Sequence, residues 1–274
     1  MGRVFSFNEI EARQVPTIEA ISGLARFIKT LAENNESIRA GVILGSVMYG
    51  RHTRRSDVDF VVIHDASQAV AAHKLFRLFY EQAAQVHVPL EVISISDQLA
   101  AASAHDIGLA LTNHLSLADK STCVVKQHPC ELLSPHVLNA REDILNYLCR
   151  KAADLERRQY HLAQMSGHEY FKYLQKLLES PIHIARRMLQ LRRESTDDSK
   201  PRVVSQYAEI VNRDLAELFE RLQSLDAEYS AELERQLEHP SEAAYKTMLK
   251  RIEQVIPDAV TFAQQNLLAV SRPP

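Results

Sequence analysis

The chain contains 274 residues, of which 46% are hydrophobic, and its formal net charge is −3. This length supports one large or two medium domains with a sizeable core, and the small net charge excludes a strong global bias toward nucleic acid or a membrane surface. No apolar run approaches the roughly 20 residues of a membrane-spanning helix. The three cysteines are too few and too irregularly spaced for a zinc site or a disulfide framework, so we expect reduced thiols in a cytoplasmic protein.

Helices and strands alternate in the first half of the chain. Residues 17–33 carry apolar side chains at helical spacing, and a second helix is expected over residues 66–85. Three short apolar runs predict strands: 40–45, 57–63 and 88–96. Because these runs are apolar on both alternating faces, they are typical of a mixed sheet that is covered on both sides by helices.

Strand patterns end near residue 130, and helical patterns follow. Pro129 and Pro135 bracket an expected linker, and Ser134 before Pro135 can cap the next helix. Pro181 predicts a kink or break within one of the later helices. The helical patterns cover 136–165, 168–193, 202–223, 226–238 and 241–269. We therefore predict an α+β fold, with a mixed-sheet domain over residues 1–130 and an all-helical domain over residues 131–274.

Two carboxylates interrupt the second predicted strand. Asp57 and Asp59 are two residues apart, so they lie on the same face of that strand. Two like charges this close repel, and they are costly to bury unless a cation lies between them. The alternative is an exposed strand start whose acids interact with neighbouring arginines.

A third carboxylate lies in the third predicted strand. Glu91 stands between Leu90 and Val92, where the pattern calls for an apolar residue. If the two strands are neighbours, the three acids can converge at one edge of the sheet. Carboxylate oxygens are the ligands that Mg²⁺ prefers, together with water and substrate phosphate, and two such ions can promote a phosphoryl transfer.

Gly45 and Ser46 follow the first predicted strand. A glycine at the end of a strand allows a ligand to approach the backbone closely. Ser46 can start a short helix whose free N–H groups face an anion, and its hydroxyl adds a further donor for phosphate. The alternative is an ordinary helix cap.

Together these residues resemble the nucleotidyltransferase superfamily that includes DNA polymerase beta. The stretch "GSVMYGRHTRRSDVDFVV", which begins at Gly45, is similar to the small bacterial members, namely the aminoglycoside nucleotidyltransferases and the minimal nucleotidyltransferases of toxin–antitoxin pairs. Leu90-Glu91-Val92 supplies the third element of the pattern. The resemblance covers residues 40–96 and implies a polymerase-beta-like fold for the first domain.

The resemblance implies transfer of a nucleoside monophosphate from a nucleoside triphosphate to a hydroxyl group, with release of pyrophosphate. Gly45 and Ser46 are expected to hold the triphosphate, and Asp57 and Asp59 to bind two Mg²⁺ ions. Glu91 is expected to be either a third metal ligand or the general base. By analogy the donor is ATP, and the acceptor is a small molecule, a protein side chain or an RNA end.

Basic residues outside the acidic strands are further candidates for phosphate contacts. Arg51, Arg54 and Arg55 lie between the glycine turn and the acidic strand, and one of them, with Arg55 as our candidate, can reach a phosphate. Lys172 and Lys176 share one helix face in the second domain, and relatives of this kind commonly bring a lysine from that domain to the triphosphate. For each of these residues the alternative is solvated surface charge.

Two other classes of protein remain open on sequence grounds. One is a nucleotide-binding regulator without turnover, although the intact acids argue against it. The other is an antitoxin or a related interaction protein that works through its helical domain.

Overall fold

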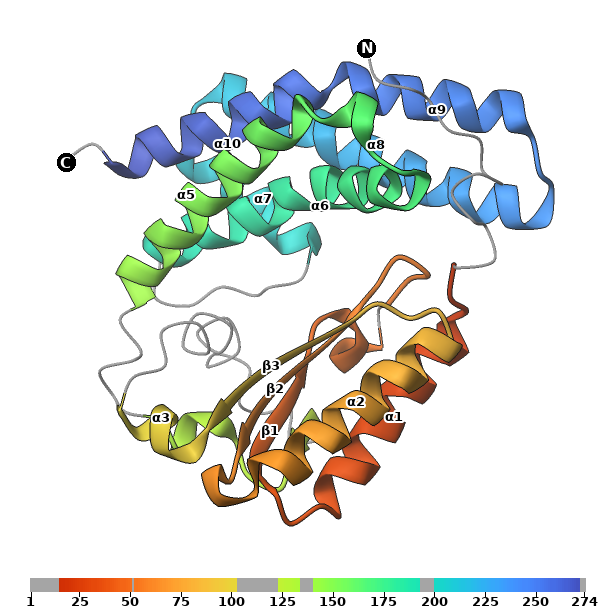
Figure 1. The fold of residues 1–274 in the computed structure, drawn as a ribbon. Helices are drawn as coiled ribbons and strands as arrows, with labels where there is room; N and C mark the ends of the chain where they lie inside the picture. Colours follow the sequence, from red (N-terminus) through yellow and green to blue (C-terminus); the bar gives the residue numbers. More distant parts are fainter. Residues whose placement is uncertain (1–14, 51, 103–122, 134–139, 193–199, 272–274) are drawn as a thin grey trace. The chain divides into compact units, whose positions relative to one another are not determined.

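The computed structural model describes residues 15–50, 52–102, 123–133, 140–192 and 200–271 (Figure 1). The chain divides into two compact units, Arg13–Asp143 and a second unit that includes Ile144–Pro274. We describe each unit separately.

A four-stranded mixed sheet forms the centre of the first unit. Its order is β3-β2-β1-β4, in which β1 is antiparallel to both β2 and β4, while β2 and β3 are parallel. The elements are α1 (Ile18–Glu33), β1 (Ile38–Leu44), η2 (Ser46–Tyr49), β2 (Val58–His64), η3 (Ala66–Gln68), α2 (Ala69–Gln85), β3 (Leu90–Ser96), α3 (Asp97–Ala102), β4 (Val124–Val125) and η6 (Pro129–Glu131). The predicted mixed sheet with helices is confirmed, and β4 is an addition that no sequence pattern indicated.

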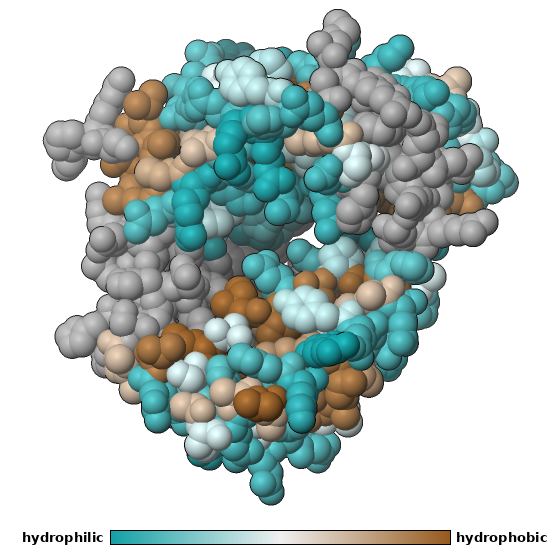
Figure 2. Space-filling view, viewed as in Figure 1, coloured by the Kyte–Doolittle hydropathy of each residue, from teal (hydrophilic) through white to brown (hydrophobic). Residues whose placement is uncertain are grey.

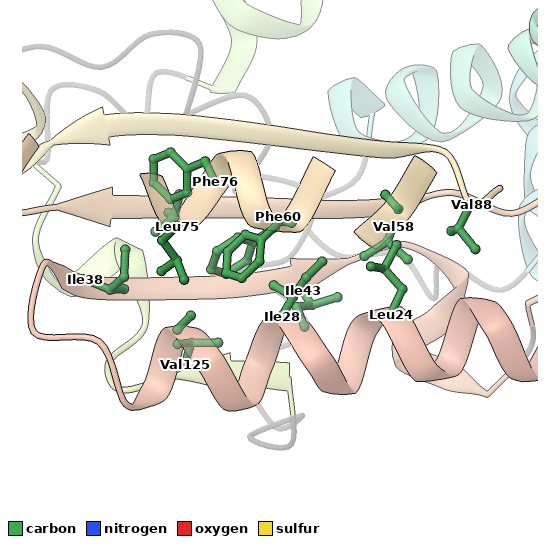
Figure 3. Close-up of a cluster of buried hydrophobic side chains, with 14 of the residues drawn as sticks. Leu24, Ile28, Ile38, Ile43, Val58, Phe60, Leu75, Phe76, Val88 and Val125 are labelled. Atoms are coloured by element: carbon green, nitrogen blue, oxygen red, sulfur yellow. The ribbon is translucent and has the colours of Figure 1, made fainter. Parts of the chain in front are cut away.

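Helices α1 and α2 lie side by side on one face of the sheet (Figure 1). Figure 3 shows the core between these helices and the sheet, where Ile28 of α1 and Leu75 and Phe76 of α2 lie around Phe60 of β2, and Leu24 of α1 lies beside Val58. The opposite face carries a smaller apolar cluster, which includes residues of β1, β2, α3 and the segment after η6. Both faces of the sheet are therefore covered over most of its length, as the apolar strands require.

The second unit is helical throughout its described residues. Its elements are α5 (Ala140–Gln159), η8 (Leu162–Gln164), α6 (Gly167–Arg192), α7 (Lys200–Ile210), α8 (Arg213–Glu238), α9 (Glu242–Gln254) and α10 (Ile256–Ser271). Hydrophilic side chains cover most of the visible face of this unit (Figure 2), while most of its large apolar side chains are buried, with Tyr160 and Leu268 as exposed exceptions. The helical region predicted after the sheet is confirmed.

Several predicted helix boundaries are wrong. Asn212 caps α8 by accepting the backbone N–H of Leu215 at 2.9 Å, so the predicted helix over 202–223 is divided between α7 and α8. Pro257 lies in the first turn of α10, where its missing N–H is tolerated, and the predicted helix over 241–269 is divided just before it.

The predictions based on prolines near the middle of the chain have different outcomes. Pro129 begins η6 within the first unit rather than a linker. Pro181 lies inside α6, which continues through this residue as one helix and is not broken there. The predicted cap at Ser134-Pro135 lies outside the described residues. Within the parts of the chain that are described, no helix is both long and apolar enough to cross a lipid bilayer.

Gly41 of β1 packs directly against the ring of Phe60. A Cβ atom at this position would lie 2.8 Å from Cε2 of Phe60, which is fully buried. We expect Gly41→Ala to lower the free energy of unfolding by about 1–3 kcal/mol, because the ring has no room to move. Chemical denaturation measures the change.

Gly23 provides a matched control for this prediction. It lies within α1, and a Cβ atom there would meet no atom of the described residues within 4 Å. Gly23→Ala should raise the free energy of unfolding by roughly 0.5–1 kcal/mol, because alanine favours the helix. A neutral or stabilising Gly41→Ala would contradict the packing that we describe.

We predict from the environment of His64 that the first unit loses stability in mild acid. Burial, and then the neighbouring charge of His73, lower the pKa of His64, and the two ring centroids lie 5.8 Å apart. The unfolded chain therefore takes up a proton at a higher pH than the folded chain, so stability is retained above about pH 6.5 and falls below it. We expect a lower free energy of unfolding at about pH 5.5 than at about pH 7.5.

A substitution isolates the contribution of His64. His64→Phe keeps an aromatic ring beside Phe76 and removes the titrating group, so it should reduce the difference in unfolding free energy between the two pH values. An undiminished pH dependence in His64→Phe would rule out this residue as a source of it.

Candidate functional site

Asp57 directly precedes β2, and Asp59 is the second residue of that strand. Val58 and Phe60 are fully buried in the core beneath α1 and α2. Because side chains alternate along a strand, Asp57 and Asp59 project to the opposite face of the sheet. Asp57 is exposed and Asp59 is half-buried, and each makes a contact with the rest of the protein. The hydrophobic alternation of β2 therefore determines which way both acids face.

Glu91 is the direct partner of Asp59 across the sheet. The parallel register of β2 and β3 pairs Asp59 with Glu91, and neighbouring strands lie about 4.8 Å apart. Ile93 and Ile95 of β3 pack in the cluster on the face that carries Asp57 and Asp59, so Glu91 is on this face as well. The structure thus brings the three predicted acids to one face at the start of two adjacent strands.

Gly45 forms a turn beside these acids. Its φ of 91° and ψ of −167° belong to a region that is essentially restricted to glycine. A Cβ atom on Gly45 would lie 4.0 Å from Oδ2 of Asp59, so the backbone of the turn runs close to that carboxylate. Ser46 then begins the short 3₁₀ helix η2. Gly45 is the residue that caps this helix, and it has no side chain that could accept a capping hydrogen bond.

The hydroxyl of Ser46 contacts the loop that precedes β2. The oxygen atoms Oγ of Ser46 and Oγ of Ser56 are 2.8 Å apart. Ser56 Oγ also accepts the backbone N–H of Thr53 at 3.0 Å, and the N–H of Ser56 donates to the carbonyl oxygen of Thr53 at 2.9 Å. The sequence does not predict this contact, because the spacing between Ser46 and Ser56 does not indicate that their hydroxyls meet.

The loop itself is tied to α1. Nε2 of His52 lies 2.8 Å from Oγ of Ser22 and 3.2 Å from the carbonyl oxygen of Ile18. The turn closed between Thr53 and Ser56 holds Arg54 and Arg55 at its two central positions, and Arg55 is only 9% exposed. Arg55 makes a contact within the protein, and its approach to a phosphate stays a prediction. Arg51 lies outside the described residues.

The donor set at this edge fits a hard divalent cation. Among the residues with described positions, no group of three or more His, Cys, Asp or Glu side chains is arranged to hold a metal ion. Two carboxylates on one face are nevertheless sufficient protein ligands for Mg²⁺, which takes its remaining oxygens from water and phosphate. Asp57 and Asp59 are therefore the residues that fit, and Glu91 as a third ligand stays a prediction.

Lys172 and Lys176 belong to the helical unit. Both are exposed on α6, one turn apart, while Tyr170 and Tyr173 of the same helix are fully buried. Tyr170 donates its hydroxyl to Glu253 Oε1 at 2.7 Å, so this side of the helix faces the core. The lysines lie on the outer side, and their predicted contact with a triphosphate is untested.

Comparison with known proteins supports the resemblance of the acidic pattern. No curated protein matches the chain. The family model of the nucleotidyltransferase domain matches residues 24–100, a range that contains Gly45, Ser46, Asp57, Asp59 and Glu91 and ends before the helical unit. Residues 24–100, within the first unit, therefore match a nucleotidyltransferase domain, which is consistent with the polymerase-beta-like superfamily.

Proposed function

We propose that this protein transfers a nucleoside monophosphate, AMP from ATP, to a hydroxyl acceptor and releases pyrophosphate. The register that pairs Asp59 with Glu91 beside the Gly45 turn carries the proposal. That arrangement brings acids and a close-approach glycine to one place, as transfer of a phosphoryl group between oxygens requires.

The glycine turn is suited to the triphosphate. Because Gly45 has no side chain, phosphate oxygens can approach the backbone at the start of η2. The hydroxyl of Ser46 can donate a hydrogen bond to the same phosphates. Arg55, Lys172 and Lys176 are the cationic candidates for the remaining phosphate charge.

The reaction forms one bond and breaks one. A lone pair of the acceptor oxygen attacks the α-phosphorus, and the bond from this phosphorus to the oxygen of the β-phosphate breaks, so that its electron pair leaves with pyrophosphate. Glu91 takes the proton of the acceptor hydroxyl and later releases it to water. Asp57 and Asp59 are the residues that would hold the metal ions described next.

Divalent metal ions are part of this proposal. Asp57 and Asp59 would hold two Mg²⁺ ions, which when bound make the attacking oxygen more nucleophilic and neutralise the charge of the leaving group. We assign the base role to Glu91 because the two aspartates and the phosphate oxygens already provide enough ligands for the metal.

Mass spectrometry of candidate acceptors tests the function directly. The purified chain is incubated with Mg²⁺, with each of the four nucleoside triphosphates in turn, and with pools of small molecules, proteins or RNA. An adduct with the mass of one nucleoside monophosphate and an equal amount of pyrophosphate are expected. Nucleotide binding without any adduct or pyrophosphate would instead support a regulator without turnover.

The acidic pair supplies the first prediction for this reaction. Asp57→Asn and Asp59→Asn should each lower turnover on the order of 10³-fold, because each removes a charge that the metal requires. The free energy of unfolding should not fall, since each variant removes one of two like charges. Turnover is measured as release of pyrophosphate.

Glu81→Gln is a matched control. It neutralises an exposed acid of α2, whose known contact is an ion pair with Arg77, and it should retain wild-type turnover. Near-wild-type turnover in either aspartate variant would exclude the proposed metal site, and unfolding of both variants would indicate a structural role.

The second prediction distinguishes the two roles of Glu91. If Glu91 is the base, Glu91→Gln should slow the chemical step by roughly 10²- to 10⁴-fold while metal and nucleotide still bind. If it is a metal ligand, added Mg²⁺ should restore part of the rate. The measurement is a Mg²⁺ titration of turnover at saturating nucleotide, and recovery with added metal would reject the base assignment.

A further inference from the structure

We propose that Ser56 is a positioning residue, which acts through Ser46 to point the Ser46 hydroxyl proton at the triphosphate. This inference rests on the proposed function, because it requires that Ser46 contact phosphate. It goes beyond that function by assigning a role to a hydroxyl that precedes the acidic strand and has no role in the chemistry itself.

Each of the two serine hydroxyls can make only a limited number of hydrogen bonds. A serine hydroxyl has one proton to donate and two lone pairs to accept with. Ser56 Oγ uses one lone pair for the Thr53 N–H, at 3.0 Å. Ser46 Oγ donates to Ser56 Oγ at 2.8 Å in this structure, and a pair of hydroxyls at this separation can reverse the direction of the bond.

A bound triphosphate selects one of these two directions. Phosphate oxygens that carry negative charge accept hydrogen bonds, so Ser46 must donate its proton to them. Ser46 then has only lone pairs to offer Ser56, and Ser56 must become the donor. The resulting chain runs from the Thr53 N–H to Ser56, then to Ser46 and then to phosphate.

Each link in this chain strengthens the next. A hydroxyl that accepts a hydrogen bond becomes a better donor, because the bonds polarise one another. Ser56 is also well fixed, since its own N–H donates to the Thr53 carbonyl oxygen at 2.9 Å and closes the turn. The oxygen of Ser46 is therefore held in place before the nucleotide binds, and only its proton has to turn from Ser56 to the phosphate, which limits the entropy lost on binding.

A double-mutant cycle on binding tests this role. The probes are ATP with a methylene group between its α- and β-phosphates and inorganic tripolyphosphate, each with Mg²⁺, measured by calorimetry. We expect Ser46→Ala and Ser56→Ala each to weaken binding about fivefold. Because Ser56 acts through Ser46, the double variant should be no weaker than Ser46→Ala, rather than about 25-fold weaker than the wild type.

Two further variants, and one comparison within the cycle, separate positioning from general damage. Ser56→Thr keeps the hydroxyl and should keep wild-type affinity. Ser67→Ala removes a hydroxyl that donates to Asp65 at 2.6 Å beyond the far end of β2, and it should leave affinity unchanged. In the Ser46→Ala background, Ser56→Ala should have no effect, whereas a turn that is merely loosened would weaken binding in that background too.

The outcomes distinguish this inference from the function on which it rests. Losses that multiply in the double variant would show that Ser56 acts independently of Ser46, and the inference would be wrong. Unchanged affinity in Ser56→Ala alone would also overturn it, while leaving the phosphate turn intact. Unchanged affinity in both single variants, or no binding of either probe to the wild type, would reject the turn as a phosphate site and with it the proposed function.

Discussion

The parallel register between β2 and β3 is the constraint on which the candidate site depends. It pairs Asp59 with Glu91. The position of each strand is fixed by apolar residues that alternate with these acids. A slip of one residue would turn Asp59 into the core and expose Phe60. Such a slip would bury a charge and expose a large ring, both of which are costly. The same apolar contacts that stabilise the sheet therefore define the face on which the acids meet.

The position of the acids along their strands matters as much as their face. The buried apolar residues of β2 extend from Val58 to Ile63, and the acids lie at its beginning, where water has access. Charges at this edge keep much of their hydration, which limits the cost of having them close together. The sheet thus presents acidic groups without placing them in its apolar interior, and the adjoining Gly45 turn has no side chain next to them.

Sequence patterns predicted the elements that have strong periodicity. The strands around Asp59 and Glu91 and the helices that cover them follow from alternation and helical spacing, and the face shared by Asp57 and Asp59 follows from alternation alone. The pairing of Asp59 with Glu91 does not, since a pattern within one strand carries no information on register. The two-residue strand β4 is too short to give any pattern. The cap at Asn212 had a recognisable signal, an asparagine directly before an acidic first turn, yet helical periodicity across it concealed the boundary.

Two glycines of the first unit show why fold and site can be tested separately. Gly41 is required by packing, because a methyl group there would strike the ring of Phe60 at 2.8 Å. Gly45 is required by its backbone, because φ is 91°, whereas among the described residues a methyl group there would meet only the Asp59 carboxylate, at 4.0 Å. The first glycine serves the core beneath α1 and α2, and the second serves the edge where the acids meet. Gly41 lies within β1 and Gly45 lies just past its end, so the two requirements fall at different positions. A substitution at Gly41 therefore acts mainly on stability. One at Gly45 changes the turn on which phosphate binding is proposed to depend.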